Sequence, residues 1–267
     1  MQTPDENELV QKVLTQVLKN NVVDNKQKVG VSRLSSSING VTEFIGTAPI
    51  GDTIGMAIAN VDPELLKNLH VDHPYRSIGL LSARTGAGPQ ILSMDEAVKG
   101  TNTEAISVQM PRDTKMGAGH GSLIIIGGDD VSDVRQAVHI GLENVPKHFG
   151  DVYNTDAGHL ELQYTARASQ ACNLAFGAPE GKAYGLIAGA PSGIGVVMAD
   201  VALKAANVEA LSFASPAHGT SFSNEGILHI SGESGAVRQA VLSAREVGLK
   251  LLSQLGGTPT NDYPSYI

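Results

Sequence analysis

The chain has 267 residues, 42% of them hydrophobic, which is enough for one large core or two cores of ordinary domain size. Its formal net charge of −8 and its lack of any Lys and Arg cluster exclude nucleic acid as a partner, because phosphate backbones require concentrated positive charge. A single cysteine excludes an internal disulfide framework and no apolar run approaches the roughly 20 residues that span a bilayer, so we expect a protein of the reducing cytoplasm.

The first 41 residues form an extension that lies outside the pattern of the remaining chain. Residues 8–19 carry aliphatic side chains at helical spacing and predict an amphipathic helix, and the polar segment 20–40 is typical of a flexible linker. Residues 1–20 lack the basic, apolar and small-residue order of a signal peptide. The helix is expected either to dock on a partner or to pack on its own domain.

From residue 42 onward, predicted strands and helices alternate. The segment 42–69 is expected to hold a short strand and a helix. Glycine-bounded apolar runs and helically spaced apolar residues then predict, in order, a strand near 77–83, a helix near 94–100, strands near 105–110 and 122–127, and a helix near 131–145.

The same order returns in the second half because the sequence repeats itself. DEAVKGTNTEAIS at 95–107 aligns with DVALKAANVEALS at 200–212, with seven of thirteen positions identical, and VRQAV at 134–138 recurs at 237–241. Self-similarity at a fixed spacing indicates that one structural unit is used twice.

The second unit is predicted to begin with another strand and helix at 158–176. It continues with a strand near 182–189, a helix near 196–206, strands near 209–214 and 226–230, and a last helix near 235–255. The chain therefore divides into an N-terminal extension (1–41) and two α+β domains (42–150 and 151–267).

One glycine-rich turn suggests a different function. Residues 188–195, AGAPSGIG, are similar to the turn with which short-chain dehydrogenases hold a pyrophosphate at a helix N-terminus. Such a turn should open the first βα unit of a chain, whereas this one lies two thirds of the way along, and no tyrosine has a lysine four residues later. A nucleotide-dependent oxidoreductase is therefore a disfavoured alternative.

The repeated segments make the chain resemble the microcompartment shell-domain family in its circularly permuted tandem form. The resemblance rests on the glycine-bounded strand and alanine-rich helix at 188–199, on KAANVE at 204–209 and on GESGAVRQA at 232–240, and it covers roughly residues 43–267. Within the family, YRSIG at 75–79, RTGAG at 84–88, SPAHGTSFSNE at 215–225 and the closing PSYI are similar to the large shell proteins of propanediol-utilisation compartments.

The resemblance implies a fold and a role. Each domain is expected to be an α/β sandwich of ferredoxin-like type, with three chains forming a pseudo-hexameric trimer that tiles with other shell proteins. The expected role is structural and non-enzymatic, without a cofactor, around an enclosed diol dehydratase that the N-terminal extension attaches. The expected solutes are glycerol and 1,2-propanediol. A shell protein of an ethanol- or ethanolamine-utilisation compartment is the nearer alternative.

The resemblance also places transport in the loops 111–121 and 215–226, between the second and third strands of each repeat. Three copies of such a loop about an axis present a ring of polar groups that replaces the water around a polyol. The candidate pore residues are Asp113, Thr114, Lys115, His120, Ser215, His218, Thr220, Ser221, Asn224 and Glu225. Solvated loop tips are the alternative interpretation.

A second conduit is predicted inside each chain, between its two domains. The loops 82–88 and 189–195 follow the first core strand of each domain and are expected to converge there. The candidate residues of this subunit channel are Arg84, Thr85 and Gly86, with the two side chains hydrogen-bonding a diol.

No catalytic or metal-binding residues are predicted. His70 and His73 lack the Cys, Asp or Glu partners of a closed zinc site. Asp129 and Asp130 fall at a strand-to-helix turn, where negative charge favours the helix N-terminus. Cys172 is expected to be a small buried hydrophobic residue, and the ordinary packed or surface histidines are His139, His148, His159 and His229.

Overall fold

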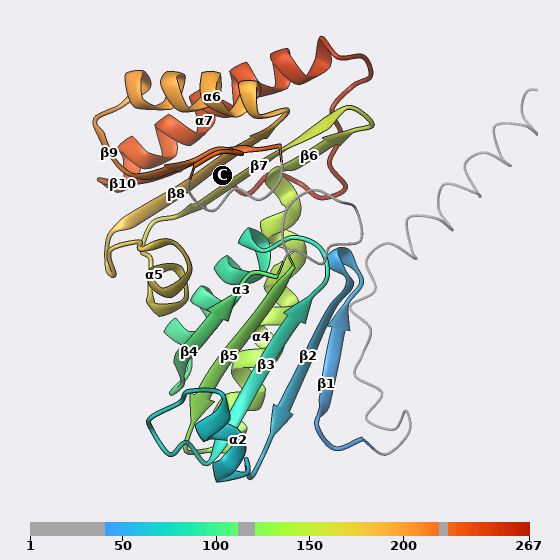
Figure 1. The fold of residues 1–267 in the computed structure, drawn as a ribbon, viewed down its shortest axis with the longest axis vertical. Helices are drawn as coiled ribbons and strands as arrows, with labels where there is room; N and C mark the ends of the chain where they lie inside the picture. Colours follow the sequence, from blue (N-terminus) through green and yellow to red (C-terminus); the bar gives the residue numbers. More distant parts are fainter. Residues whose placement is uncertain (1–40, 112–120, 219–223) are drawn as a thin grey trace, which may run out of the picture. The chain divides into compact units, whose positions relative to one another are not determined.

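The computed structural model describes residues 41–111, 121–218 and 224–267. Within these ranges the chain forms two five-stranded antiparallel sheets of matching strand order (Figure 1). The predicted helix at 8–19 and the linker at 20–40 lie outside the described residues.

The first sheet has the order β1-β2-β3-β5-β4. Helices α3 (Gly88–Lys99) and α4 (Val131–His148) cover one face, and the short helix α2 (Pro63–Asn68) lies on the other (Figure 1). The strands are β1 (Phe44–Ala48), β2 (Thr53–Ile58), β3 (Ser77–Ala83), β4 (Glu104–Gln109) and β5 (Ser122–Gly128).

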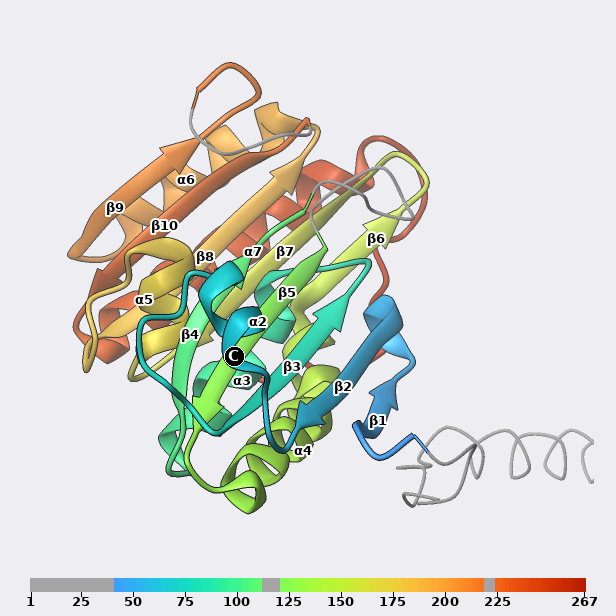
Figure 2. The ribbon, with the colours of Figure 1, turned by 60° about the horizontal axis from the view of Figure 1, so that its bottom comes forward.

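The second sheet repeats this plan with the order β6-β7-β8-β10-β9. Helices α6 (Ser192–Ala205) and α7 (Ser234–Ser253) cover one face, and α5 (Gln170–Phe176) lies on the other (Figure 2). The strands are β6 (Val152–Thr155), β7 (Gly158–Thr165), β8 (Ala183–Ala190), β9 (Val208–Ala214) and β10 (Gly226–Gly232). The predicted α+β fold class, with one unit used twice, is confirmed.

Equivalent acidic residues fix the starts of α4 and α7. The Asp130 carboxylate accepts a hydrogen bond from the Ser132 N–H (2.7 Å), and the Glu233 carboxylate accepts one from the Gly235 N–H (2.8 Å). Each cap satisfies a backbone donor that the helix cannot satisfy itself, and its negative charge favours the helix N-terminus.

Three details differ from the sequence prediction, one of them being the strand β6 at Val152–Thr155, which was not predicted. The segment 42–69 holds two strands rather than one, because a tight turn with Gly51 at φ 71° folds β1 back on β2. Helices α3 and α6 begin at Gly88 and Ser192, before their predicted starts, because turns containing glycine and proline form the first helical turn. The loops before both helices are correspondingly shorter.

One apolar cluster spans both halves. Ile91 and Leu92 of α3 are fully buried and belong to the same apolar cluster as Leu186 of the second sheet. Beside them the buried Asp95 carboxylate accepts hydrogen bonds from the first backbone N–H groups of α5, including that of Cys172 (3.0 Å). Apolar packing and a charged helix cap therefore both hold α3 against the second half.

The C-terminal tail is tied to the second sheet through Asp151. Its buried carboxylate accepts hydrogen bonds from the Tyr266 N–H (3.0 Å), the Ser265 hydroxyl (3.1 Å) and the Arg245 guanidinium (2.7 Å). The Tyr266 hydroxyl then reaches β7, where it donates to the Gln163 side-chain oxygen (2.7 Å). One carboxylate thus joins the tail, α7 and the start of β6.

We expect Asp151→Ala to lower the free energy of unfolding by about 3 kcal/mol, because the guanidinium and the tail N–H groups lose a buried acceptor. Urea denaturation of the purified protein measures the change. Asp156→Ala, in the exposed turn between β6 and β7, is the control and should change it by less than about 0.5 kcal/mol. Equal effects of the two substitutions would contradict the role given to Asp151.

Candidate functional site

The two halves meet along a seam lined with polar side chains. We use "seam" for the loop 84–87 and the first turn of α3 on one side, and for three polar residues of β7 on the other. These three are His159, Glu161 and Gln163. Because side chains alternate along a strand, they share one face of β7, while Leu160 and Leu162 between them are buried on the other. A side chain at Gly88 would collide with the Glu161 carboxylate, so α3 approaches β7 closely.

On the first-half side, two buried polar atoms lack a partner in the described structure. Gln90 donates from its amide nitrogen to the Thr53 hydroxyl (3.0 Å) and to the Thr85 carbonyl (3.2 Å), but its amide oxygen accepts no hydrogen bond. The Thr85 hydroxyl is also buried without a partner. Each such group costs about 1–3 kcal/mol, and the neighbours of the Gln90 side chain, Thr53, Gly51 and Gly86, all belong to the first half.

On the second-half side, an ion pair crosses the middle strand of the sheet. His159 on β7 lies 2.6 Å, from Nε2 to Oε1, from Glu225 at the start of β10. The strand between them, β8, contributes small residues, Ala188 and Ala190, opposite Glu161 and His159. Because alanines leave space above the sheet, long side chains from both neighbouring strands meet over β8.

Burial and charge shift two pKa values in the seam. Burial raises the pKa of Glu161 from its ordinary 4.5 to about 7; the negative charge of Glu225 also raises it, while His159 and a hydrogen bond from Gln163 lower it. Burial lowers the pKa of His159, but the hydrogen bond and negative charge of Glu225, together with the charge of Glu161, raise it more, so the net shift is upward. The imidazolium–carboxylate pair is therefore favoured in the fold.

The described pore-loop candidates do not form one cluster. Ser215 and His218 close a turn after β9 by exchanging backbone hydrogen bonds (2.8 and 3.1 Å). Asn224 caps α6 instead, because its side-chain oxygen accepts from the Ser192 N–H (3.2 Å) and hydroxyl (2.8 Å). Glu225 is buried in the seam beside His159. The candidates outside the described residues are Asp113, Thr114, Lys115, His120, Thr220 and Ser221.

The subunit-channel candidates lie at the seam with different degrees of burial. Arg84 is exposed, Thr85 turns its hydroxyl inward, and Gly86 (φ 80°) lies against the ring of Phe149. The facing polar groups come from β7, whereas the loop 189–195 packs on β10 and on Gly158. Gln90, His159, Glu161 and Gln163 were missed as site residues, although HLELQ at 159–163 alternates polar and apolar residues.

The glycine turn at 188–195 has a packing role. A side chain at Gly195 would collide with the backbone of Gly226, and one at Gly189 would meet the backbone of Gly195. The helix N-terminus that a phosphate would need is occupied by the Asn224 cap. Close contact between α6 and β10 therefore explains the glycines that resemble a nucleotide turn.

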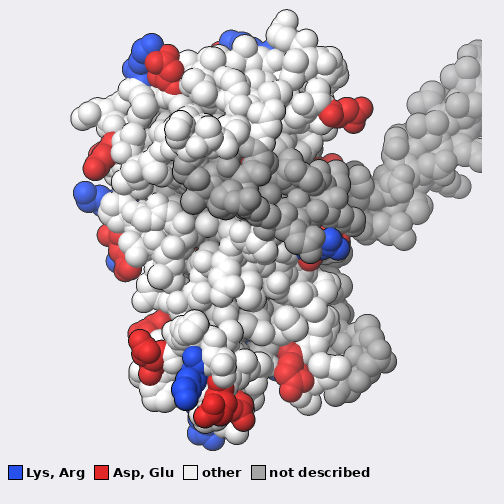
Figure 3. All heavy atoms as spheres, in the orientation of Figure 1, with Lys and Arg blue, Asp and Glu red and all other residues white. Residues whose placement is uncertain are grey.

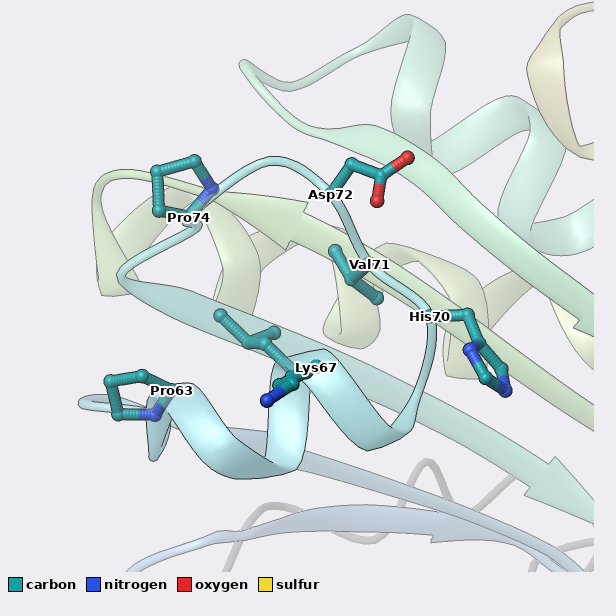
Figure 4. A pocket seen from close by; sticks show the side chains of 7 residues that line it. Pro63, Lys67, His70, Val71, Asp72 and Pro74 are labelled. Atoms are coloured by element: carbon teal, nitrogen blue, oxygen red, sulfur yellow. The ribbon is translucent and has the colours of Figure 1, made fainter.

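Outside the seam, a hollow of about 400 Å³ lies at α2, at the far ends of β2 and β3 (Figure 4). Its polar side chains, Lys67, His70 and Asp72, point in different directions and do not converge (Figure 4). Among the described residues, no group of three or more His, Cys, Asp or Glu is placed to hold a metal ion. Within residues 41–111, 121–218 and 224–267, no helix is long and apolar enough to cross a membrane.

Charged side chains are sparse on the described surface. On the face in Figure 3, Lys and Arg are scattered among Asp and Glu, and most described atoms belong to uncharged residues. Cys172 is fully buried, and burial raises the pKa of its thiol well above the ordinary value, so the thiol stays protonated.

Comparison with known proteins identifies the repeated unit. The family described as "BMC domain" matches residues 77–156 and again residues 183–258. The bacterial microcompartment shell protein PduB of Limosilactobacillus reuteri is 65% identical over 232 residues, covering 87% of this chain and 98% of the relative. PduB of Salmonella typhimurium is 57% identical over 268 residues, covering 98% and 99%. A crystal structure of a trimeric PduB shell protein matches with a TM-score of 0.82 and 66% identity, over 85% of this chain and 100% of that one.

The two matches place one BMC domain in each half of the chain, which is the tandem organisation that the repeat indicated. The chain belongs to the BMC-domain family and is a structural component of a bacterial microcompartment shell, not an enzyme. Its high identity to PduB proteins supports a role in the shell of a propanediol-utilisation compartment, and neither the ethanolamine-type nor the oxidoreductase alternative is favoured. The family resemblance noted in the sequence is thereby confirmed.

Replacing Glu161 should change how stability depends on pH. Below its ordinary pKa of 4.5, Glu161 is protonated in both the folded and the unfolded chain. Between pH 4.5 and about 7 only the folded chain keeps the proton, so the free energy of unfolding falls as pH rises and then levels off. We expect Glu161→Gln to remove this fall, which amounts to about 3 kcal/mol.

Denaturation at a series of pH values measures this effect. Glu180→Gln, at an exposed loop residue, is the matched control and should keep the wild-type slope. The same slope in wild type and Glu161→Gln would show that Glu161 titrates normally in the fold.

Proposed function

We propose that three copies of this chain close into a pseudo-hexameric ring and that such rings tile with other shell proteins. The proposed domains are 42–150 and 151–267, preceded by the extension 1–41. The trimer named for the matching PduB structure supports this assembly. The observation that carries the proposal is that residues buried between the two halves have exposed counterparts elsewhere on the same chain.

Helix α6 presents apolar side chains whose counterparts in α3 are buried. The repeat aligns Ile91 with Val196, Leu92 with Val197 and Val98 with Leu203. The three residues of α3 are 0%, 0% and 7% exposed, whereas those of α6 are 51%, 42% and 42% exposed. Since α3 is buried by the second half of its own chain, α6 requires an equivalent surface from another copy.

The first sheet offers that equivalent surface. In the second sheet, the face on which α3 and α5 pack buries Leu186 to 5% exposure. Its counterpart on the first sheet, Leu80, is only half-buried, as are Ile54, Met56 and Leu123. Within one chain, α3 of the first half packs on the sheet of the second half. In the proposed ring, α6 of the second half packs in the same way on the first sheet of the next chain. Contacts of this head-to-tail kind form a ring when the rotation closes.

Only one of the two kinds of seam in such a ring is lined with polar groups. The seam inside each chain contains Gln90 and Glu161, whose counterparts at the seam between chains are Gly195 and Ile54. Apolar contact would therefore seal the seams between chains. Small polyols such as glycerol and 1,2-propanediol are proposed to pass through the three polar seams, past Arg84, Thr85 and Gly86.

The unsatisfied atoms at the seam give a physical reason for polyol selectivity. Among the described residues, the Thr85 hydroxyl and the Gln90 amide oxygen are buried without partners, so a diol that hydrogen-bonds to both would remove this cost. An apolar solute of the same size leaves both atoms unsatisfied. This supports the passage of polyols in preference to hydrocarbons.

Further parts of the role rest on the sequence. The loops 111–121 and 215–226 are proposed to surround the central axis, and the amphipathic segment 8–19 is proposed to attach enclosed enzymes such as a diol dehydratase. The shell itself is proposed to lie in the bacterial cytoplasm.

Placing a charge on α6 should break the ring. We expect Leu203→Glu to convert the trimer to monomers in sedimentation velocity, because it buries a carboxylate at each of three contacts, at roughly 3 kcal/mol each. Leu174→Glu, on α5, is the matched control: this helical leucine is 48% exposed and is not expected to lie in an interface. A Leu203→Glu protein that stays trimeric would contradict the proposed interface.

Removing the unsatisfied hydroxyl should affect stability and binding in opposite directions. We expect Thr85→Val to preserve or raise the free energy of unfolding, because a buried unpaired group is lost. Binding of 1,2-propanediol, followed by ligand-observed NMR, should weaken roughly threefold to tenfold. Thr260→Val, at an exposed residue, should change neither quantity. Unchanged diol binding in Thr85→Val would count against passage through the seam.

A further inference from the structure

Helix α5 of the second half packs against α3 and the edge strand β4 of the first half (Figure 1). Its residues Ala171 and Cys172 are fully buried in the apolar cluster to which α3 belongs. At its start, the Gln170 side-chain oxygen accepts a hydrogen bond from the Ala105 N–H of β4 (2.8 Å). With the Asp95 carboxylate on the first N–H groups of α5, these contacts fix its position.

Helix α2 is the counterpart of α5 in the first half, and its equivalent surface is open in the described structure. The residues before the two helices, Asp62 and Ser169, occupy the same place, so Leu65 of α2 corresponds to Cys172 of α5. Leu65 is 41% exposed, whereas Cys172 is fully buried. The apolar face by which α5 docks is therefore present on α2 without a described cover.

The surface equivalent to that under α5 is open as well. Strand β9 is the counterpart of β4, and Ala105 and Val108, which are half-buried on β4, correspond to Ala210 and Phe213, which are exposed on β9. Leu203, on the neighbouring helix α6, is 42% exposed. Exposed apolar residues on adjacent elements form a patch of the kind that marks a contact between proteins.

Lys204 adds charge complementarity between the two surfaces. Its counterpart Lys99 donates to the backbone carbonyl two residues before the cap of α5 (2.8 Å). Lys204 is 74% exposed and pairs with Asp200 of its own helix (2.7 Å). In the place equivalent to that of Lys99, its ammonium group also meets Asp62 and Glu64 at the start of α2.

We propose that α2 of one chain docks against α6 and β9 of the next chain, in the place that α5 takes against α3 and β4 within a chain. The occupant of this surface is a second copy of the same protein. The inference rests on the proposed ring and adds the helix and the edge strand that complete each contact between chains.

The two kinds of contact differ in how the short helix is capped. Ser169 makes no side-chain cap at α5, and Asp95 supplies the acceptor from α3. Asp62 instead caps α2 from within, since its carboxylate accepts the Glu64 N–H (2.8 Å). Helix α2 is thus capped before the chains meet, and docking does not require Asp200 to replace Asp95 as a buried acceptor.

Paired cysteines test the docking. Because the Asp95 carboxylate binds the Cys172 N–H (3.0 Å), their counterparts Asp200 and Leu65 should lie within reach of a short bis-maleimide across each contact between chains. We expect the full-length protein with Leu65→Cys and Asp200→Cys to run mostly as a covalent trimer on a denaturing gel. Native Cys172 is fully buried and should not react.

Single variants establish the direction of the contact. Leu65→Cys alone and Asp200→Cys alone should give no cross-link, and their co-expression should give covalent dimers without trimers, because the contact is head-to-tail. Leu174→Cys combined with Asp200→Cys is the matched control and should stay unlinked, since Leu174 is equally exposed but lies on α5. Cross-linking of Leu65→Cys alone would mean that two α2 helices meet, which would overturn the proposal.

Hydrogen exchange gives a second test that needs no added cysteine. Backbone amides of α2 and β9 should exchange roughly tenfold more slowly in the wild-type trimer than in monomers of Leu203→Glu. The amides of α5 should exchange alike in both, because α5 docks within its own chain. Equal exchange of α2 in trimer and monomer would contradict the docking.

Failure of the docking is distinguishable from failure of the ring. If the double-cysteine protein sediments as a trimer but does not cross-link, the docking of α2 is refuted and the ring stands. If the wild-type protein sediments as a monomer, the ring is refuted, and the docking with it.

Discussion

Asp95 lies fully buried between the two halves of the chain, where its carboxylate accepts hydrogen bonds from the first N–H groups of α5 and faces Lys99 at 3.2 Å. A buried carboxylate is tolerated only when such partners are complete, so the helix that carries it can dock in one position. This contact fixes α3 on the second sheet. The shared apolar core and the close approach of Gly88 to Glu161 both follow from it.

The docking of α3 also explains why polar groups collect where they do. Glu161 and His159 are held between a helix start and a sheet, with small residues on β8 beneath them. There both side chains are partly shielded from bulk water. The equivalent face of the first sheet carries isoleucine, methionine and leucine at β2, β3 and β5, which is suited to contact with another chain. Two similar folds thus carry different surfaces at equivalent positions.

Most of the fold could be predicted from the sequence because the repeat and the periodicity of apolar residues agree. The strands near 77–83 and 122–127 and the helix starting at Val131 were located to within a few residues. The hairpin of β1 and β2 was missed, since it depends on a turn at Gly51 that leaves little trace in hydrophobic patterning. The polar seam was largely missed because its members come from β7, α3 and β10 and meet only after the halves dock. Thr85 was named because of its loop and stays a prediction, whereas Glu161 resembled an ordinary solvent-facing strand residue.

Covalent fusion of two similar units has a consequence for what such a shell protein can become. In a ring of six identical chains, any substitution appears at every junction, so sealing one junction seals them all. Here the positions of Glu161 and Ile54 are encoded separately, and each can change without the other. In the proposed ring, apolar junctions can therefore alternate with junctions lined by polar groups, and a mutation that strengthens one kind of junction leaves the other kind unchanged. Doubling the domain within one polypeptide separates mechanical strength from permeability.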